Sequence, residues 1–217
     1  MYFKNKISVI MSVYNTPFVI VKRAIDSVLN QDFTDFEFII IDDGSDNNSQ
    51  FEILNYAIAN EDKITYLRHK NCSQSDSINR GIQISNSEYI TVIDADDEYK
   101  PNHLSTCLSE MKSLDLIAST TETIIETESD YYVPDRFDIN KLIHVDDCIL
   151  FATLFGKKEV FTTLNFKNMY GADAHFYECA EQQFMVQKLD LRTYIYYRNN
   201  PNSVTAKVKN NTATIND

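Results

Sequence analysis

Three closely spaced aspartates are the residues of this sequence best suited to chemistry. Asp94, Asp96 and Asp97 directly follow the apolar residues 89–93. Carboxylates this close repel one another, and a hard divalent cation bound among them relieves the repulsion and can recruit a phosphate group. An acidic turn can instead cap a following helix, with Asp97 or Asn102 as the cap. Taken alone, the cluster is compatible with a metal site and with a simple capping loop.

Polar residues also follow two earlier apolar segments. Asp42 and Asp43 come after residues 36–41 and begin the sequence Asp-Asp-Gly-Ser, while Tyr14 comes directly after residues 7–13. A carboxylate at the second position could accept a hydrogen bond from the edge of a nucleotide base, and a tyrosine could stack on the ring. Both features also have structural explanations, because Asp-Asp-Gly-Ser is a good turn sequence and a tyrosine can pack beneath a loop.

The composition and the missing motifs disfavour several classes of protein. The four glycines, Gly44, Gly81, Gly156 and Gly171, match neither the dinucleotide-binding fingerprint nor the P-loop, which disfavours nicotinamide dehydrogenases and P-loop ATPases. Lys and Arg number 20 and Asp and Glu number 32, so the net charge is −12. This charge argues against nucleic-acid binding through a basic face. If the protein binds phosphate, a divalent cation is the obvious source of positive charge.

The cysteines and histidines suggest no zinc motif. The four cysteines lie far apart in the sequence, and neither they nor the four histidines have the spacing typical of a zinc site. We therefore expect reduced, buried thiols and no zinc.

The first half of the chain alternates between strand and helix patterns. Apolar, β-branched segments predict strands at residues 7–13, 36–41, 64–67 and 89–93. Apolar residues at three- and four-residue spacing predict intervening helices: one beginning at Pro17 with Thr16 as its cap, one with Phe51, Leu54 and Ile58 on its apolar side, one at 75–84 and one beginning at Pro101. This alternation predicts a mainly parallel sheet covered by helices on both faces. Its carboxyl edge, where open α/β sheets bind ligands, should gather the polar residues described above.

The pattern is weaker after about residue 112. We expect strands at 114–119 and 121–127, an amphipathic helix at 146–155, a helix at 174–188 and a strand at 192–198. We expect one domain over residues 1–217, with a flexible tail at 207–217. The apolar stretch near the start is too short for a signal peptide and no run approaches the ~18 residues that span a bilayer, so we expect a soluble, cytoplasmic protein.

Four motifs, in order and spacing, resemble the family 2 glycosyltransferases of GT-A fold. They lie at residues 7–15, at 27–31 (Ser-Val-Leu-Asn-Gln), at 36–45 ending in Asp-Asp-Gly-Ser, and at 88–101 containing Asp-Ala-Asp-Asp. Residues 74–81 resemble the segment that precedes the metal motif in many of these enzymes. The resemblance is firm over residues 7–111 and looser at 170–173 and 196–198. It implies a Rossmann-like GT-A domain with a nucleotide-sugar-binding half at 1–111 and an acceptor and catalytic half at 112–206.

The resemblance also implies roles for residues of the first half. Ser12, Tyr14 and Asp43 would hold the nucleotide, with Asp43 accepting the N3–H of a uracil-type base. Asp94 and Asp96 would be the two acids of the family's Asp-x-Asp motif. Asp96 is the expected direct ligand of Mn²⁺ or Mg²⁺, and Asp94 would reach the ribose or the metal. The cation would neutralise the pyrophosphate as the sugar leaves.

In the second half, the resemblance places the catalytic base at Asp173, near the start of a helix. An aspartate there could take the proton of an acceptor hydroxyl and so give inversion, or it could simply belong to the first turn of the helix. Glu178 and Glu181 lie further along the same helix and are weaker candidates. Arg198 could contact a phosphate, as could Gln74 and Asp76, which we include as possible donor contacts.

The sequence departs from the family pattern at two places. Ala172 stands where many relatives have Glu, and Asn199 and Asn200 follow Arg198 where many have a metal-binding His. A late metal ligand is therefore in doubt, whereas the Asp pair is not.

The predicted function is metal-assisted, inverting transfer of a sugar from a nucleotide-diphosphate donor, with UDP-sugar favoured, to a hydroxyl of a glycan or lipid-linked acceptor. Peripheral membrane association is compatible with this. The alternatives are a degenerate domain that binds sugar nucleotides without turnover and a receiver-type signalling domain. The latter is disfavoured because Arg68 to Asn71 stand where its phosphoacceptor aspartate would be.

Overall fold

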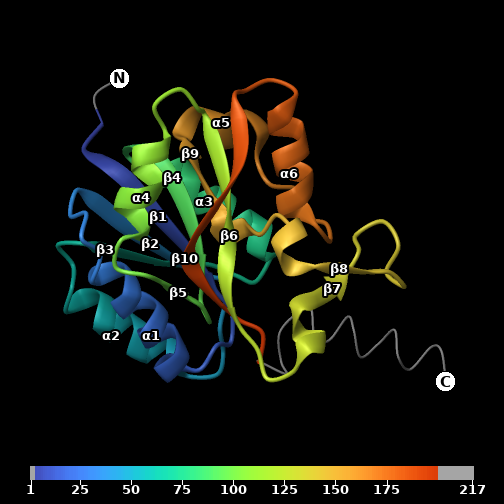
Figure 1. Ribbon diagram of the computed structural model, residues 1–217. Helices are drawn as coiled ribbons and strands as arrows, with labels where there is room; N and C mark the ends of the chain where they lie inside the picture. Colours follow the sequence, from blue (N-terminus) through green and yellow to red (C-terminus); the bar gives the residue numbers. More distant parts are fainter. Residues whose placement is uncertain (1–2, 200–217) are drawn as a thin grey trace.

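The first four strands form the parallel half of a central sheet. The computed structural model describes residues 3–199 (Figure 1). In it, β1 (Asn5–Val13), β2 (Phe36–Asp42), β3 (Ile64–Arg68) and β4 (Ser87–Asp94) pair in parallel in the order β3-β2-β1-β4. The apolar residues at the centres of β1, β2 and β4 are buried, as expected for strands covered on both faces. The four predicted strands are therefore confirmed.

Helices cover both faces of the sheet. One face carries α1 (Phe18–Leu29), α2 (Ser49–Ile58) and α4 (His103–Glu110), whose buried side chains belong to one apolar cluster. The other face carries α3 (Gln74–Ile84), α5 (Lys158–Leu164) and α6 (Ala172–Glu181), whose buried side chains belong to a second cluster. Figure 1 shows these helices on either side of the strands.

The second half of the chain extends the sheet to eight strands. The short β9 (Leu154–Lys157) pairs antiparallel with β4 and with β6 (Leu116–Ile124). Beyond β6, β10 (Val186–Tyr197) runs parallel to β6, and β5 (Glu98–Tyr99) pairs antiparallel with β10. A separate hairpin joins β7 (Tyr132–Pro134) to β8 (Leu142–His144). The result is an α/β fold with a mixed, mainly parallel central sheet, as expected.

Several expectations for the second half are wrong. Residues 146–155 form no α-helix; they contain two 3₁₀ turns, η2 (Val145–Asp147) and η3 (Phe151–Thr153), and then enter β9. Sheet pairing outweighs the helical pattern here, because Phe155 lies opposite both Thr91 and Ile117 in the ladders. The segments 114–119 and 121–127 belong to one strand, β6. The helix expected at 174–188 ends at Glu181.

Two details of the first half also differ from expectation. Pro17, not Thr16, occupies the cap position of α1, without a side-chain hydrogen bond. The apolar side expected for α2 is largely exposed, with Phe51 and Ile58 60% and 57% exposed, while Ile53 is buried. A partly apolar helix can face the sheet with either of two stripes, and the stripe with smaller side chains faces inward here.

Among the described residues, no helix combines the length and hydrophobicity needed to cross a bilayer. The tail expected at 207–217 lies outside the described residues. The boundary between two functional halves near residue 111 stays a prediction.

Candidate active site

The carboxyl ends of three neighbouring strands bring predicted site residues together. In the ladders, Ser12 of β1 lies opposite Asp94 of β4, and Val13 lies opposite Asp42 of β2. Because a parallel register fixes the order of residues across the sheet, the turns that follow these strands share one edge. The structure thus places Ser12, Asp94 and the turn containing Asp43 along a continuous edge.

Asp43 is buried and its carboxylate is held from the adjoining loop. It accepts hydrogen bonds from the backbone N–H of Cys72 (2.8 Å) and from Nδ2 of Asn71 (3.1 Å). The loop packs closely because Gly44 has a positive φ of 81°, and a Cβ there would lie 2.6 Å from the backbone nitrogen of Asn71. These contacts fix the orientation of the carboxylate at the edge of the sheet.

Asp42 has a structural role. Its fully buried carboxylate accepts hydrogen bonds from the backbone N–H of Ser45 (2.7 Å) and the hydroxyl of Tyr66 (2.5 Å), and Nε of Arg68 lies 3.6 Å away. Of the two aspartates of the Asp-Asp-Gly-Ser turn, Asp42 therefore closes the turn and Asp43 faces the loop of Asn71.

Tyr14 is 52% exposed, so its ring is not packed beneath the loop. The next residue, Asn15, has a positive φ of 51° and connects the turns after β1 and β2. Its backbone N–H donates to Oγ of Ser45 (3.0 Å), and its Oδ1 accepts from the backbone N–H of Asp46 (2.8 Å). This tie leaves the Tyr14 ring open to solvent at the edge where a base could stack.

Asp94 and Asp96 form the acidic centre of the edge. Oδ1 of Asp94 accepts a hydrogen bond of 2.8 Å from Nε2 of Gln74, at the start of α3. Burial first, and then the negative charges of Asp96 and Asp173, raise the pKa of Asp94 to about 7. Asp173 is thus near enough to affect the pKa of Asp94, although the two are 79 positions apart in the sequence.

Asp97 does not belong to this open cluster. It is 1% exposed and accepts hydrogen bonds from the hydroxyl of Tyr194 and the backbone N–H of Tyr197, both on β10. Burial, followed by the charges of Asp96 and Asp94, raises its pKa well above the ordinary value. Its contacts join β10 to the acidic turn. It does not cap the next helix, and Asn102 holds the cap position of α4 without a side-chain capping bond, its Nδ2 donating instead to the hydroxyl of Thr106.

Asp173 is the second residue of α6. The helix begins after Gly171, whose φ of +71° turns the chain sharply, as expected. Oδ1 of Asp173 accepts a hydrogen bond of 2.8 Å from the backbone N–H of Ala174. Burial raises the pKa of Asp173 to about 6, although these backbone bonds oppose the rise. A carboxylate with this pKa is largely ionised at neutral pH and can still accept a proton, which suits a general base.

A pocket of about 390 Å³ lies beside Asp173, between α6 and the β7–β8 hairpin. Its walls include Arg136, Cys148, Tyr170 and Glu178. Arg136 forms an ion pair with Glu178, which commits that carboxylate to a partner. The sequence analysis missed this pocket because the hairpin carries no motif. The only available signal was the turn-rich composition of residues 134–141.

The remaining candidates are placed as follows. Asp76 lies in the first turn of α3, where its backbone N–H donates to the cap residue Ser73 and its carboxylate accepts from the Ser73 hydroxyl. Arg198 is 7% exposed, and its guanidinium donates to the backbone oxygen of Asp130 (3.1 Å) and to the hydroxyl of Tyr196 (3.3 Å). Glu181 lines the pocket beside Asp173. Donor contacts from Asp76 and Arg198 stay predictions. Each of these side chains would have to contact the donor in addition to the hydrogen bonds that it already makes within the protein.

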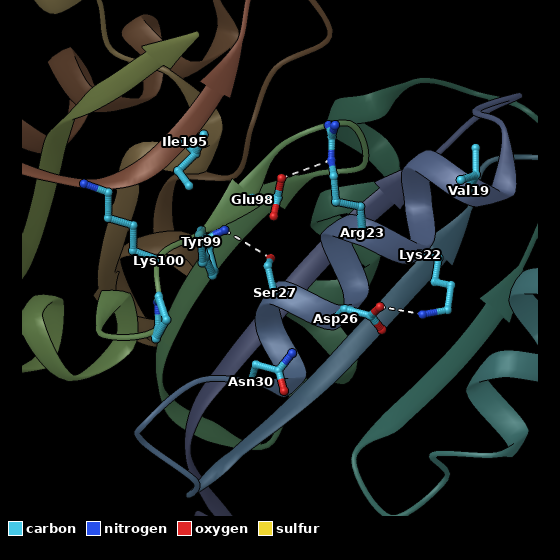
Figure 2. A pocket seen from close by; sticks show the side chains of 11 residues that line it. Val19, Lys22, Arg23, Asp26, Ser27, Asn30, Glu98, Tyr99, Lys100 and Ile195 are labelled. Atoms are coloured by element: carbon cyan, nitrogen blue, oxygen red, sulfur yellow. Dashed lines mark hydrogen bonds and ion pairs between the residues drawn. The ribbon is translucent and has the colours of Figure 1, made fainter.

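A larger groove of about 570 Å³ lies between α1 and β5 and is lined by none of the predicted site residues (Figure 2). Arg23, which lines it, pairs with Glu98 (3.2 Å), donates to the backbone oxygen of Asp96 (2.5 Å) and stacks on Tyr197 at 3.8 Å. Figure 2 shows Arg23 reaching from α1 toward Glu98. Arg23 in the wall of the groove therefore connects α1 to the backbone of the acidic turn.

Comparisons with known proteins agree with the geometry. A putative colanic acid biosynthesis glycosyl transferase, WcaA of Escherichia coli, is 38% identical over 109 residues, which cover 50% of this chain and 38% of WcaA. The fold resembles Staphylococcus aureus TarS residues 1–349 in complex with UDP-GlcNAc, with a TM-score of 0.70, 15% identity, and coverage of 93% of this chain and 60% of TarS. It also resembles the mannosyltransferase PcManGT of Pyrobaculum calidifontis in complex with GDP-Man and Mn²⁺, with a TM-score of 0.70, 14% identity, and coverage of 99% and 65%.

The chain spans only part of its relatives, between 30% and 59% of the length of the first three curated proteins that it matches. The profile of glycosyl transferase family 2 matches residues 8–176, more than half of the chain. The match includes the strand-end aspartates and Asp173, and it confirms the family expected from the sequence motifs. The chain belongs to glycosyl transferase family 2.

Proposed function

We propose that this chain transfers a sugar from a UDP-sugar to an acceptor hydroxyl, with a divalent cation and with inversion at the anomeric carbon. The observation that supports the proposal is the acidic turn of Asp94 and Asp96 at the sheet edge that also holds Asp43, with the charge of Asp173 near enough to affect the pKa of Asp94. A donor site, a leaving-group site and a base are the three parts that such a transfer needs.

The nucleotide would lie along the ends of β1 and β2. The fixed carboxylate of Asp43 would accept the N3–H of the base, and the exposed ring of Tyr14 would stack on it. A uracil offers such a ring N–H, whereas adenine has none on its pairing edge, which favours UDP over an adenine nucleotide. The GDP-Man bound by PcManGT makes GDP the competitor to test.

The donor set of the acidic centre suits Mn²⁺ or Mg²⁺. Carboxylate oxygens are the ligands that these hard cations prefer, and mutual repulsion already raises the pKa of Asp94. Asp96 and Asp94 would hold the ion. When bound, it would supply positive charge to the pyrophosphate as that group leaves.

Asp173 would act as general base. Its carboxylate faces the pocket between α6 and the β7–β8 hairpin, which we assign to the acceptor. The acceptor hydroxyl would give its proton to Asp173 as its oxygen attacks the anomeric carbon opposite the leaving phosphate. A glycan or lipid-linked acceptor and a cytoplasmic location stay predictions.

Calorimetric titration with UDP tests the donor site. We expect binding in Mn²⁺ that is at least about 10-fold weaker in excess EDTA, since bare pyrophosphate is repelled by the acids. Asp96→Asn should lose most of the metal dependence, whereas Asp46→Asn, which removes an exposed acid from the neighbouring turn, should retain it. Equally tight binding in EDTA would refute the metal assignment.

Release of UDP from UDP-sugars then separates an enzyme from a binding domain. We expect turnover that depends on Asp173. We also expect NMR to show a product of inverted anomeric configuration. Donor binding without any turnover across a panel of donors and acceptors would instead identify a degenerate domain.

A further inference from the structure

A second cluster of metal-ligating side chains lies at the turn after β2, where the nucleotide base is proposed to bind. Oδ1 of Asp43, Nδ1 of His69 and Sγ of Cys72 are mutually 3.4, 3.5 and 3.7 Å apart. In the part of the chain that the structure describes, this is the one group of three His, Cys or acidic side chains with ligand atoms in such proximity. No zinc spacing was visible in the sequence because Asp43 follows β2, whereas His69 and Cys72 follow β3.

We infer that Asp43, His69 and Cys72 form a site for Zn²⁺ or a similar borderline cation, and that its occupation excludes the nucleotide base. Bonds of about 2.0 to 2.3 Å at tetrahedral angles place the donor atoms of a zinc site about 3.3 to 3.6 Å apart. The three observed separations lie within about 0.1 Å of this range. One carboxylate, one imidazole and one thiolate would leave a fourth position open.

The surroundings of the three side chains support coordination. Oγ of Ser77 lies 3.1 Å from Nε2 of His69 and can accept its hydrogen, which leaves the Nδ1 lone pair for a metal. In the metal-free protein, Nδ1 also lies 2.8 Å from the backbone oxygen of Lys70, so this tautomer must be selected on binding. The thiol of Cys72 donates to Asp43. A cation would replace that proton as the bridge between sulfur and carboxylate, and the proton would pass to solvent.

The cluster differs chemically from the acidic centre at Asp94 and Asp96. All-oxygen ligands favour Mg²⁺ and Mn²⁺, whereas sulfur and nitrogen favour Zn²⁺. A cation on Oδ1 of Asp43 would engage the carboxylate that the proposed function assigns to the nucleotide base. This second half of the inference rests on the proposed function, and it predicts that zinc opposes donor binding while manganese promotes it.

Cobalt substitution tests the site itself. Co²⁺ added to the full chain in excess Mg²⁺ should give the near-ultraviolet charge-transfer band of a cobalt–thiolate bond, and Zn²⁺ should abolish the band by displacement. Cys72→Ala should remove it, and His69→Ala should weaken Co²⁺ binding by at least about 10-fold. Cys179→Ala is the matched control, since Sγ of Cys179 also lies 3.7 Å from a histidine nitrogen. No band in the wild type, or a band that survives Cys72→Ala, would overturn the site.

Uridine tests the exclusion of the base. Uridine has no phosphate to chelate the metal, so saturating uridine should raise the apparent dissociation constant of Co²⁺ in the wild type. A band that uridine leaves unchanged, in a protein that binds uridine, would overturn the exclusion. If uridine does not bind at all, the assignment of Asp43 to the base fails, and the exclusion fails with it, while the band still decides the metal site.

Discussion

Replacing Asp94 by asparagine should stabilise the metal-free protein at neutral and alkaline pH. The pKa of Asp94 is raised to about 7 in the folded state, first by burial and then by the charges of Asp96 and Asp173, against about 3.9 in an unfolded chain. The folded state therefore binds this proton more tightly than the unfolded state. The stability that protonation gives is complete below about pH 4 and is lost as the pH rises through about 7.

The size of the effect follows from the same shift. One pH unit between folded and unfolded pKa values corresponds to about 1.4 kcal/mol, which sets a ceiling of about 4 kcal/mol. Asp94 is partly exposed to solvent, and screening reduces this, so we expect Asp94→Asn to gain about 1–2 kcal/mol near pH 8. Asparagine keeps an oxygen that can accept the hydrogen bond from Gln74. For a domain of this size the gain corresponds to about 2–8 °C in Tm.

Scanning calorimetry in EDTA at pH 4, pH 6 and pH 8 measures the effect. The variant should be close to the wild type at pH 4, where folded Asp94 is protonated and the unfolded group is near its own pKa, and its advantage should grow through pH 6 to pH 8. Mn²⁺ should stabilise the wild type more than the variant, since the cation relieves the same repulsion. Glu61→Gln, which removes one exposed charge, controls for net charge. A variant that is less stable than the wild type at pH 8, or a difference that does not change with pH, would refute the electrostatic account.

Three further changes test other parts of the structure. Asp173→Asn should lower turnover by about 10² or more without lowering Tm, since burial raises the pKa of Asp173 as it does that of Asp94. Wild-type transfer should fall about 10-fold per pH unit below about pH 6, because the ionised form of the base is lost. Near-normal transfer by the folded variant would eliminate this base. Gly44→Ala should lower the free energy of unfolding by at least about 1–2 kcal/mol, because its φ is +81° and the new Cβ would lie 2.6 Å from the backbone nitrogen of Asn71. Urea denaturation measures this change, and an unchanged unfolding midpoint would contradict the close packing of the loop. Tyr194→Phe removes a hydrogen-bond donor from buried Asp97 and should lower the free energy of unfolding by about 1–3 kcal/mol. The control Tyr132→Phe, at a half-exposed ring, should change it little. Equal losses in the two variants would show that the buried hydrogen bond contributes nothing to stability.

The parallel half of the fold was predictable because local sequence and tertiary structure agree there. β1, β2 and β4 are continuous apolar segments, and the polar residues that follow their carboxyl ends belong to the family motifs. Right-handed crossovers leave few ways to arrange such elements, so the shared edge followed from topology. The apolar face of α2 was wrong because Phe51 and Ile53 lie on competing stripes, and propensity does not choose between them.

The second half was less predictable because its pairing is non-local. β9 is four residues long and acquires its place only by insertion between β4 and β6. The periodicity of residues 146–155 predicts a helix. Nothing within that segment indicates that its last residues pair with β4 and β6, and this pairing outweighs the helical preference. The proximity of Asp173 to Asp94 was reached through resemblance alone, since the elements that join them have no motif.

The acidic turn shows why the two halves depend on each other. Burial first, and then the charges of Asp96 and Asp94, raise the pKa of Asp97. Tyr194 and Tyr197 of β10 satisfy the carboxyl group of Asp97. The strand that ends at Tyr197 thus holds the acids in place, and the helix before it carries the proposed base. Asp97 already joins β10 to the acidic turn, so a late metal ligand is not required to connect the two halves. A chain with Asn199 after Arg198, in place of the usual histidine, can therefore still keep its Asp-x-Asp pair in position.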